Sequence, residues 1–278
     1  MTSDDHGLEQ WLEANPFLVP LARFQGAVAQ AAAAALLPAL TLPPFDVHAE
    51  PYGAGVPLLR SPTHAAPLVA AGASVLGEVT RRAGSAPLPS TLAAGIAEVH
   101  ATLSTEGARR AAVEWLVAGG DEQAAPVQAG ILRFLGWSAL SRVLAPLSAP
   151  FAAWRDDPAW RRPTCPTCGQ LPVMAQLVTK DGARQRILSC GCCPTRWGFR
   201  RLGCPYCGNE DPQRLNVLEL QGPSGLRLDV CESCRGYMKT YAGVGQEVLL
   251  LADWTTLVLD AMAGERGYVR RGASLFDL

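Results

Sequence analysis

The sequence predicts an α+β fold: an N-terminal helical bundle, then two rubredoxin- or zinc-ribbon-like four-cysteine metal modules, and a C-terminal helix. Three observations predict it. Before residue 155, apolar residues recur at three- and four-residue steps, as on one face of a helix. All nine cysteines lie between Cys165 and Cys234, among short alternating segments and turn residues. After Val248 the helical spacing of apolar residues returns.

These patterns divide the chain into three regions. We expect a helical domain at 1–160, a tandem metal-knuckle β domain with two four-cysteine sites at 161–245, and a C-terminal helix and tail at 246–278 that pack on the rest. The first boundary is placed near Asp156-Asp157-Pro158, because the helical pattern stops there.

Four stretches of the first region show the helical pattern. They begin near Asn15-Pro16, at Ser61-Pro62 and at Ser90, and the fourth occupies 127–144. Ser61 stands before a proline and is predicted to be an N-cap. In the last region Asp253 is predicted to cap the C-terminal helix in the same way.

The middle region carries strand signals. Segments 171–178 and 183–190 flank Lys180-Asp181-Gly182, a turn sequence that favours a β-hairpin. Segment 226–230 alternates strictly between apolar and polar residues, so it is predicted to be a strand.

Composition and charge limit the function classes. The 278 residues carry a net charge of −1, which gives the whole chain no electrostatic reason to bind nucleic acid or an anionic membrane. The acidic start Met1-Thr2-Ser3-Asp4-Asp5 lacks the positive region of a secretory signal. We therefore expect a cytoplasmic protein without membrane insertion, in a reducing compartment where thiols persist to bind metal.

The cysteines form four C-x-x-C pairs. They are Cys165 with Cys168, Cys190 with Cys193, Cys204 with Cys207, and Cys231 with Cys234. The first two pairs are separated by 21 residues and the last two by 23, and both units begin Cys-Pro-x-Cys-Gly. The pattern is one unit repeated, which is a strong signal for two metal sites.

The spacing has a physical reason. Two thiolates three residues apart on a tight turn reach one ion, proline fixes φ at the entrance, and Gly169 or Gly208 supplies a positive φ. A second knuckle on the facing hairpin completes a tetrahedron of four cysteines. Sequential pairing of the knuckles is expected, although an interleaved arrangement stays open. Cys192 is interpreted as uncoordinated, because only Cys190 with Cys193 keeps the knuckle spacing.

Tetrahedral thiolate sites suit both iron and zinc, so the spacing leaves the metal open. With four protein ligands each, both sites lack an open position, and we expect no catalytic residues and no enzyme activity. The four histidines all lie in the helical half. Arg196, Arg200 and Arg201 beside two aromatic residues are interpreted as a solvated strand face rather than a nucleic-acid contact.

The cysteine motifs and the residues around them resemble a known family, the formate dehydrogenase accessory proteins called FdhE. The matching pieces, in chain order, are Cys165-Pro166-Thr167-Cys168-Gly169, Leu171-Pro172-Val173, Leu188, Thr195-Arg196-Trp197, both later knuckles, Tyr237-Met238-Lys239, 253–260, Glu265-Arg266-Gly267-Tyr268 and Arg270. The specific resemblance covers about 115 residues at the C-terminal end. The family commonly has a glutamate where Arg196 stands, and Cys192 is an additional cysteine.

The resemblance implies a non-catalytic protein needed for active formate dehydrogenase. It would bind two iron ions in rubredoxin-like sites, with zinc as the alternative metal, and would contact the immature catalytic subunit of that enzyme. Two other functions stay open on the residues themselves. One is a rubredoxin-like electron-transfer protein, and the other is a zinc-ribbon nucleic-acid-binding protein.

Overall fold

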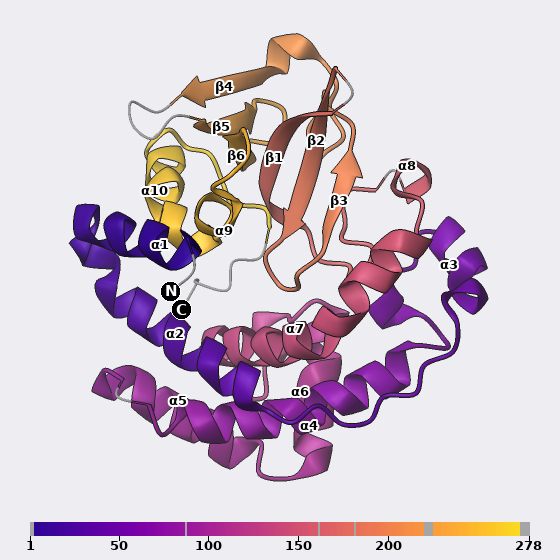
Figure 1. Ribbon diagram of the computed structural model, residues 1–278, viewed down its shortest axis with the longest axis vertical. Helices are drawn as coiled ribbons and strands as arrows, with labels where there is room; N and C mark the ends of the chain where they lie inside the picture. The colour runs from indigo at the N-terminus through magenta and orange to yellow at the C-terminus, as the bar shows by residue number, and fades with distance from the viewer. Residues whose placement is uncertain (1–2, 87, 161, 181, 220–224, 273–278) are drawn as a thin grey trace.

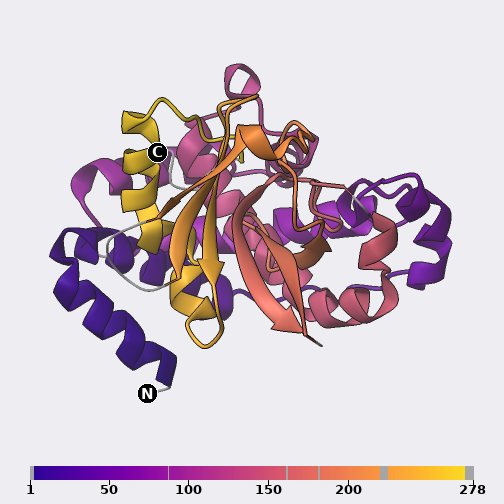
Figure 2. The ribbon, with the colours of Figure 1, turned by 90° about the horizontal axis from the view of Figure 1, so that it is seen from above.

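The computed structural model describes residues 3–272 with the exception of 87, 161, 181 and 220–224. Figure 1 shows a layer of helices at the bottom of the view and a single β-sheet above it. Seen from above, the strands lie over these helices (Figure 2). The predicted α+β class is confirmed.

The first region consists of helices joined by loops. Its helices are α1 (Ser3–Ala14), α2 (Val19–Ala34), α3 (Ala49–Gly53), α4 (Ala65–Ala83), α5 (Ser90–Thr102), α6 (Glu106–Ala118), α7 (Ala129–Trp154) and α8 (Asp157–Trp160). Short 3-10 turns occur at Pro16–Leu18, Phe45–His48, Leu58–Arg60 and Glu122–Ala124.

Helix α4 is the centre of this bundle and packs against α2, α5, α6 and α7. Its apolar stripe is fully buried, as helical spacing predicts. Close approach to α7 requires a glycine, because a Cβ on Gly72 would lie 2.8 Å from Leu140 Cδ2. Packing rather than capping therefore holds α4 in place.

The predicted N-cap at Ser61 is wrong. Helix α4 begins four residues later at Ala65, after His64, and no side chain caps it. The Ser61 hydroxyl instead lies 3.1 Å from Thr63 Oγ1 and 3.3 Å from His64 Nδ1. A local side-chain hydrogen bond has thus replaced the expected bond to the helix backbone.

The second region folds into one six-stranded sheet. The strands are β1 (Pro172–Lys180), β2 (Ala183–Cys190), β3 (Arg196–Phe199), β4 (Leu215–Glu219), β5 (Leu226–Cys231) and β6 (Tyr237–Ala242), in the order β3-β2-β1-β6-β5-β4. The predicted hairpin forms, since Lys180 pairs with Ala183, although Asp181 of its turn lies outside the described residues.

Each cysteine module contributes three consecutive antiparallel strands to this sheet. The modules join where β1 runs parallel to β6, with Met174 opposite Lys239 and Leu177 opposite Ala242. The two predicted modules therefore share one continuous sheet. The main buried cluster also extends from the helical bundle into the first module, where it includes Leu188 and Trp197.

The C-terminal region packs against the second module. It contains α9 (Glu247–Leu250), a 3-10 turn at Asp253–Thr256 and α10 (Leu257–Glu265). Leu250, Leu259 and Ala263 join residues of β5 and β6 in a second buried cluster. Figure 1 shows α1 beside α9 and α10, which agrees with the contacts between α1 and α9.

The predicted N-cap role of Asp253 is wrong. Helix α10 begins at Leu257, and the side chain of Asp253 is buried against Lys239 and Arg270 instead. Among the residues that the structure describes, none of the helices combines the length and the apolar character that crossing a bilayer requires.

Candidate metal centres

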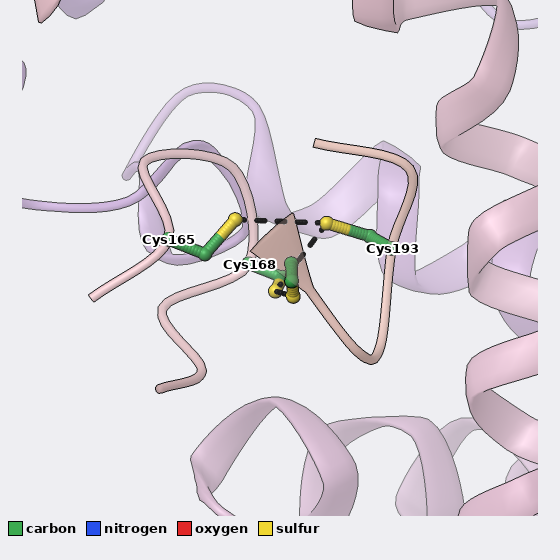
Figure 3. A group of neighbouring side chains, drawn as sticks. Cys165, Cys168 and Cys193 are labelled. Atoms are coloured by element: carbon green, nitrogen blue, oxygen red, sulfur yellow. Dashed lines mark hydrogen bonds between the residues drawn. The ribbon is translucent and has the colours of Figure 1, made fainter. Parts of the chain in front are cut away.

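Four cysteines of the first module converge beneath the sheet, and we call this group the inner site. Cys165 and Cys168 lie on the turn before β1, Cys190 ends β2, and Cys193 precedes β3. The Sγ atoms are 3.6 Å apart for Cys165 and Cys193, 3.4 Å for Cys168 and Cys190, and 3.5 Å for Cys168 and Cys193. Figure 3 shows the labelled sulfurs of Cys165, Cys168 and Cys193 pointing toward one another.

The second module repeats the arrangement, and we call its group the outer site. Cys204 and Cys207 lie on the turn before β4, Cys231 ends β5, and Cys234 precedes β6. The Sγ atoms of Cys204 and Cys234 are 3.7 Å apart, as are those of Cys207 and Cys231. The chain thus groups its knuckles sequentially, first with second and third with fourth.

These sulfur positions fit a tetrahedral ion. With metal–sulfur bonds of about 2.3 Å, the edge of a regular tetrahedron is about 3.8 Å, close to the separations in both groups. In each group all four sulfurs lie within 4.8 Å of one another. None of the nine cysteines, all of which are described, forms a disulfide. The donor set and its geometry therefore suit a thiophilic ion such as iron or zinc.

The first knuckle of each module has the same backbone geometry. The N–H of Gly169 donates to the carbonyl of Cys165 at 2.9 Å, and that of Gly208 donates to Cys204 at 3.0 Å. The two glycines have φ of 81° and 75°, the left-handed region that a side chain resists. In the outer site the Tyr206 N–H points at the Cys204 sulfur, 3.4 Å away, as a metal knuckle requires.

The last knuckle holds Arg235 where the first and third knuckles hold a glycine. Its φ is 56°, the one positive value among the described residues other than glycine. The surroundings hold this conformation: its guanidinium lies 4.1 Å from the centre of the Tyr268 ring and donates to the carbonyl of Arg266 at 2.7 Å. The C-terminal segment therefore fixes the knuckle of Cys234.

Electrostatics explain why each group needs a cation. Burial raises the pKa of the Cys168, Cys190 and Cys193 thiols. Burial also disfavours the thiolate of Cys165, but hydrogen bonds from these three thiols outweigh it and lower the pKa of Cys165. One thiolate is thus stabilised at the expense of the others, and four anionic sulfurs coexist only around a positive ion.

The outer site titrates differently because it is less enclosed. Burial raises the pKa of Cys204 to about 12. At Cys231 burial is outweighed by backbone N–H groups of Cys234 and Ser233, and the pKa falls to about 7. A thiolate at Cys231 is therefore the first sulfur anion that this group offers to an arriving ion.

Cys192 lies outside the four-sulfur group of the inner site, although its backbone N–H donates to the Cys190 sulfur at 3.4 Å. Its side chain is buried and borders a cavity of about 570 Å³ between α2, α7 and the second knuckle. The assignment of Cys190 and Cys193, rather than Cys192, as metal ligands stays a prediction.

The helical bundle forms direct hydrogen bonds with the first knuckle. Backbone N–H groups of Leu58 and Leu59 donate to the carbonyls of Pro166 and Thr167 at 3.0 and 2.8 Å. The hydroxyl of Thr195 donates to that of Thr167 at 2.7 Å and ties the second knuckle to the first. The bundle therefore positions the inner site, a relationship that the spacing of the cysteines does not reveal.

The arginine run of the sequence does not form a uniform face. Trp197 between these residues is buried, and Arg200 forms an ion pair with Glu210 and lies over the Phe199 ring. Arg196 donates to the side chain of Gln176 on β1 of the same module. Arg196 and Arg200 thus contact other groups of the protein, and all three arginines of the run are exposed.

Sequence reasoning missed a buried ion cluster beside the outer module. Lys239 on β6 and Arg270 near the C-terminus bind Asp253 and Asp260 at 2.6 to 2.8 Å. A signal was present, because Lys239 interrupts an otherwise apolar and β-prone segment. Identifying its partners required the fold.

The helical layer and the duplicated four-cysteine module define a protein with two closed four-thiol groups, each of which could hold one metal ion. The chain matches no protein-family model. It is 31% identical over 202 residues to the FdhE homolog of Pseudomonas aeruginosa, an alignment that covers 68% of this chain and 62% of that protein. It is 33% identical over 147 residues to protein FdhE of Escherichia coli O1:K1, covering 50% of this chain and 46% of that one.

The crystal structure of the FdhE protein from P. aeruginosa superposes with a TM-score of 0.62 over 92% of this chain and 85% of that chain, at 24% identity, which shows a shared fold. The chain belongs to the FdhE family. In sequence it spans about half to three fifths of these curated relatives' own length.

Proposed function

We propose that the chain is a non-catalytic, cytoplasmic accessory protein for the assembly or maturation of formate dehydrogenase. In this proposal it binds two iron ions and contacts the immature catalytic subunit of that enzyme. The ligands are the eight knuckle cysteines, namely Cys165, Cys168, Cys190 and Cys193 in the inner site and Cys204, Cys207, Cys231 and Cys234 in the outer site.

The observation that carries this proposal is the pair of four-sulfur groups. All-thiolate donor sets select soft or borderline ions, and a complete set of four leaves no position for substrate or water. A closed site of this kind stabilises a fold or carries an electron. Membership of the FdhE family supplies the link to formate dehydrogenase, and nine unpaired thiols favour a reducing compartment.

Electron transfer of the rubredoxin type is the second candidate, and one observation favours it. Cys207 of the outer site is exposed, so an ion bound there lies near the molecular surface. Electron transfer requires such proximity to a redox partner. Nucleic-acid binding is less favoured, because Arg196 and Arg200 already donate to acceptors of the protein itself.

Elemental analysis with a visible spectrum tests the proposal. The full chain is purified without oxygen and measured before and after exposure to air. Two irons per chain and a ferric-thiolate colour that appears on oxidation are expected. Two zincs that persist after expression in iron-replete, zinc-depleted medium would overturn the assignment of iron.

The partner is tested separately. A formate dehydrogenase catalytic subunit is co-expressed with this chain in a host that lacks its own FdhE, and formate oxidation is assayed in lysates. The wild-type chain is expected to restore activity, and the Cys168→Ser, Cys207→Ser double variant is expected to fail. Equal activity with and without the chain would remove the accessory function.

A further inference from the structure

We propose that the two sites differ in their exchange behaviour: the inner site retains its ion, and the outer site exchanges its ion with a thiolate-bearing molecule. This inference rests on the proposed function only in requiring that both groups bind metal. It goes beyond that function by assigning the contact with a metal donor or acceptor to one of the two sites.

Exposure of the sulfur-bearing side chains distinguishes the sites. In the inner site Cys165 and Cys168 are 0% exposed and Cys193 is 5% exposed, with Cys190 partly buried. In the outer site Cys207 is exposed and Cys234 is partly buried. Ligand exchange at a tetrahedral ion begins when an incoming donor approaches it, so the exposed edge at Cys207 permits an attack that the inner site resists.

The surrounding structure reinforces this difference. Cys165, Cys168 and Cys193 belong to the main buried cluster, so opening the inner site disturbs the core that joins the bundle to the sheet. Within the described residues, the four outer cysteines belong to neither buried cluster. In Figure 1, β4 and β5 lie at the top of the view, far from α4, α6 and α7 at the bottom. Opening the outer site therefore costs less free energy.

A cavity of about 150 Å³ leads to the outer site. Cys204 and Cys231 line it together with Arg186, Arg201 and Arg227, and Asp229 is the one carboxylate in its lining. The excess of guanidinium groups attracts an anionic ligand toward the sulfurs. A thiolate combines this negative charge with the soft donor atom that the ion prefers.

The inner site also borders a cavity, the space of about 570 Å³ lined by Cys190, Cys192 and Cys193. That cavity lies between α2, α7 and the sheet, and the three sulfur-bearing side chains behind Cys190 are at most 5% exposed. An incoming ligand would meet the helices before the ion. The size of the cavity therefore does not make the inner site the more reactive one.

The exchange step requires no oxidant or reductant. An incoming thiolate forms a bond to the ion as the Cys207 sulfur leaves, so four thiolates remain on the ion and no electron moves. The released Cys207 sulfur then takes a proton from water. Repetition at Cys234, which is partly buried, and then at the more buried Cys204 and Cys231 would release the ion bound to four external thiolates.

Metal release by a chromophoric chelator tests the proposal on the full chain. Protein loaded with two zinc ions is mixed with excess 4-(2-pyridylazo)resorcinol, an anionic chelator, and the absorbance of its zinc complex is followed. We expect two phases of one zinc each, with rates that differ at least tenfold. Adding reduced glutathione is expected to accelerate only the fast phase.

Mass spectrometry assigns the phases without relying on variants. Samples quenched with N-ethylmaleimide at the end of the fast phase are expected to carry label on the four outer cysteines and on none of the inner ones. Cys207→Ser is expected to abolish the fast phase and leave the slow one. Arg201→Met in the cavity lining is expected to slow the fast phase about threefold, and Arg110→Met on the distant helix α6 is its matched control.

A single release phase for both ions, or labelling of the inner cysteines first, would overturn the proposal and leave the proposed function intact. Failure of the chain to bind any zinc or iron would overturn both. The two failures are therefore distinguished by the metal content measured before the chelator is added.

Discussion

The Nζ of Lys239 lies 2.6 Å from Oδ1 of Asp253, and the two side chains are only 1% and 6% exposed. Asp253 also accepts two hydrogen bonds of 2.7 Å from Nη2 of Arg270, and Asp260 binds both cations. Two carboxylates thus neutralise two cations inside the protein. The cluster fastens β6 of the outer module to the segment that leads into α10.

Asp253→Asn is expected to lower the free energy of unfolding by about 3 kcal/mol, because it leaves an uncompensated buried cation beside Asp260. Urea unfolding of the metal-loaded protein measures this loss. Glu78→Gln, which breaks an exposed ion pair of α4 with Arg81, is the control and is expected to leave the midpoint nearly unchanged. Equal effects of the two changes would contradict a buried, interdependent cluster.

The same cluster makes the protein sensitive to strong acid. Burial alone would raise the pKa of Asp253, but Lys239 and Arg270 outweigh it and hold that pKa below its usual value. A depressed carboxyl pKa contributes stability that is present above about pH 4 and is lost as the pH falls through the folded-state value. Unfolding curves below pH 4 should therefore converge for the wild type and Asp253→Asn.

Cys168→Ser is expected to reduce the bound metal from two ions to one and to lower the melting temperature, because the binding free energy of a closed site is also folding free energy. Cys192→Ser is expected to retain two ions, since Cys192 lies outside the four-sulfur group and its backbone N–H, which contacts the Cys190 sulfur, is kept in the variant. Atomic absorption on both variants checks this pair. Metal loss in Cys192→Ser would show that the knuckle register is wrong.

Glycine substitutions test how tightly the helical bundle packs against the first knuckle. Gly169→Ala and Gly208→Ala both place a side chain at positive φ, which costs about 1 to 2 kcal/mol. At Gly169 the added Cβ would also lie 2.9 Å from Cγ of Pro57, so the loss is expected to be larger there. Gly107→Ala in α6 meets no atom within 4 Å and is the control, expected to stabilise slightly. Thermal unfolding ranks the three variants. An equal loss of stability in Gly169→Ala and Gly208→Ala would contradict tight packing of the bundle on the first knuckle.

Buried His48 should give a second, milder acid dependence. Burial and the nearby His64 lower the pKa of His48 from 6.5 to about 4. A depressed histidine pKa means that stability is complete above pH 6.5 and falls as the pH drops toward 4, by up to about 3 kcal/mol. His48→Phe keeps an aromatic ring between Tyr52 and Phe151 and is expected to flatten this dependence. Urea unfolding at pH 7.5 and 5 gives the comparison, and unchanged pH dependence in the variant would rule out His48 as its source.

The candidate site was predictable from local chemistry. A C-x-x-C turn followed by glycine fixes its own backbone, so the motif of Cys165 and Cys168 already predicted the positive φ of Gly169. The hairpin of β1 and β2 was likewise predictable, because alternating residues and a turn determine it within 20 residues. Periodicity also identified α4, α5 and α7, although their starts were misplaced by up to four residues.

Long-range relationships were not predictable in the same way. Helix α6 escaped notice because its apolar stripe is interrupted by charged residues, yet Thr105 caps it with a 3.1 Å bond to the Ala108 N–H. Asp253 has the local sequence pattern of a helix N-cap. In the structure its carboxylate instead forms ion pairs with the buried cations Lys239 and Arg270, which come from distant segments. Local patterns in a single sequence do not identify partners that only the folded structure brings together.

The parallel pairing of β1 with β6 has a consequence for synthesis on the ribosome. Met174 and Lys239 are neighbours in the sheet, but roughly 65 further residues are translated after Met174 before Lys239 is available to pair with it. During that interval the edge of β1 is an unpaired template on which another nascent chain can add a strand. A ribosome that stalls within the second module would thus release an aggregation-prone fragment. The edge of β1 is protected from pairing with other chains only after β6 of the second module has been synthesised.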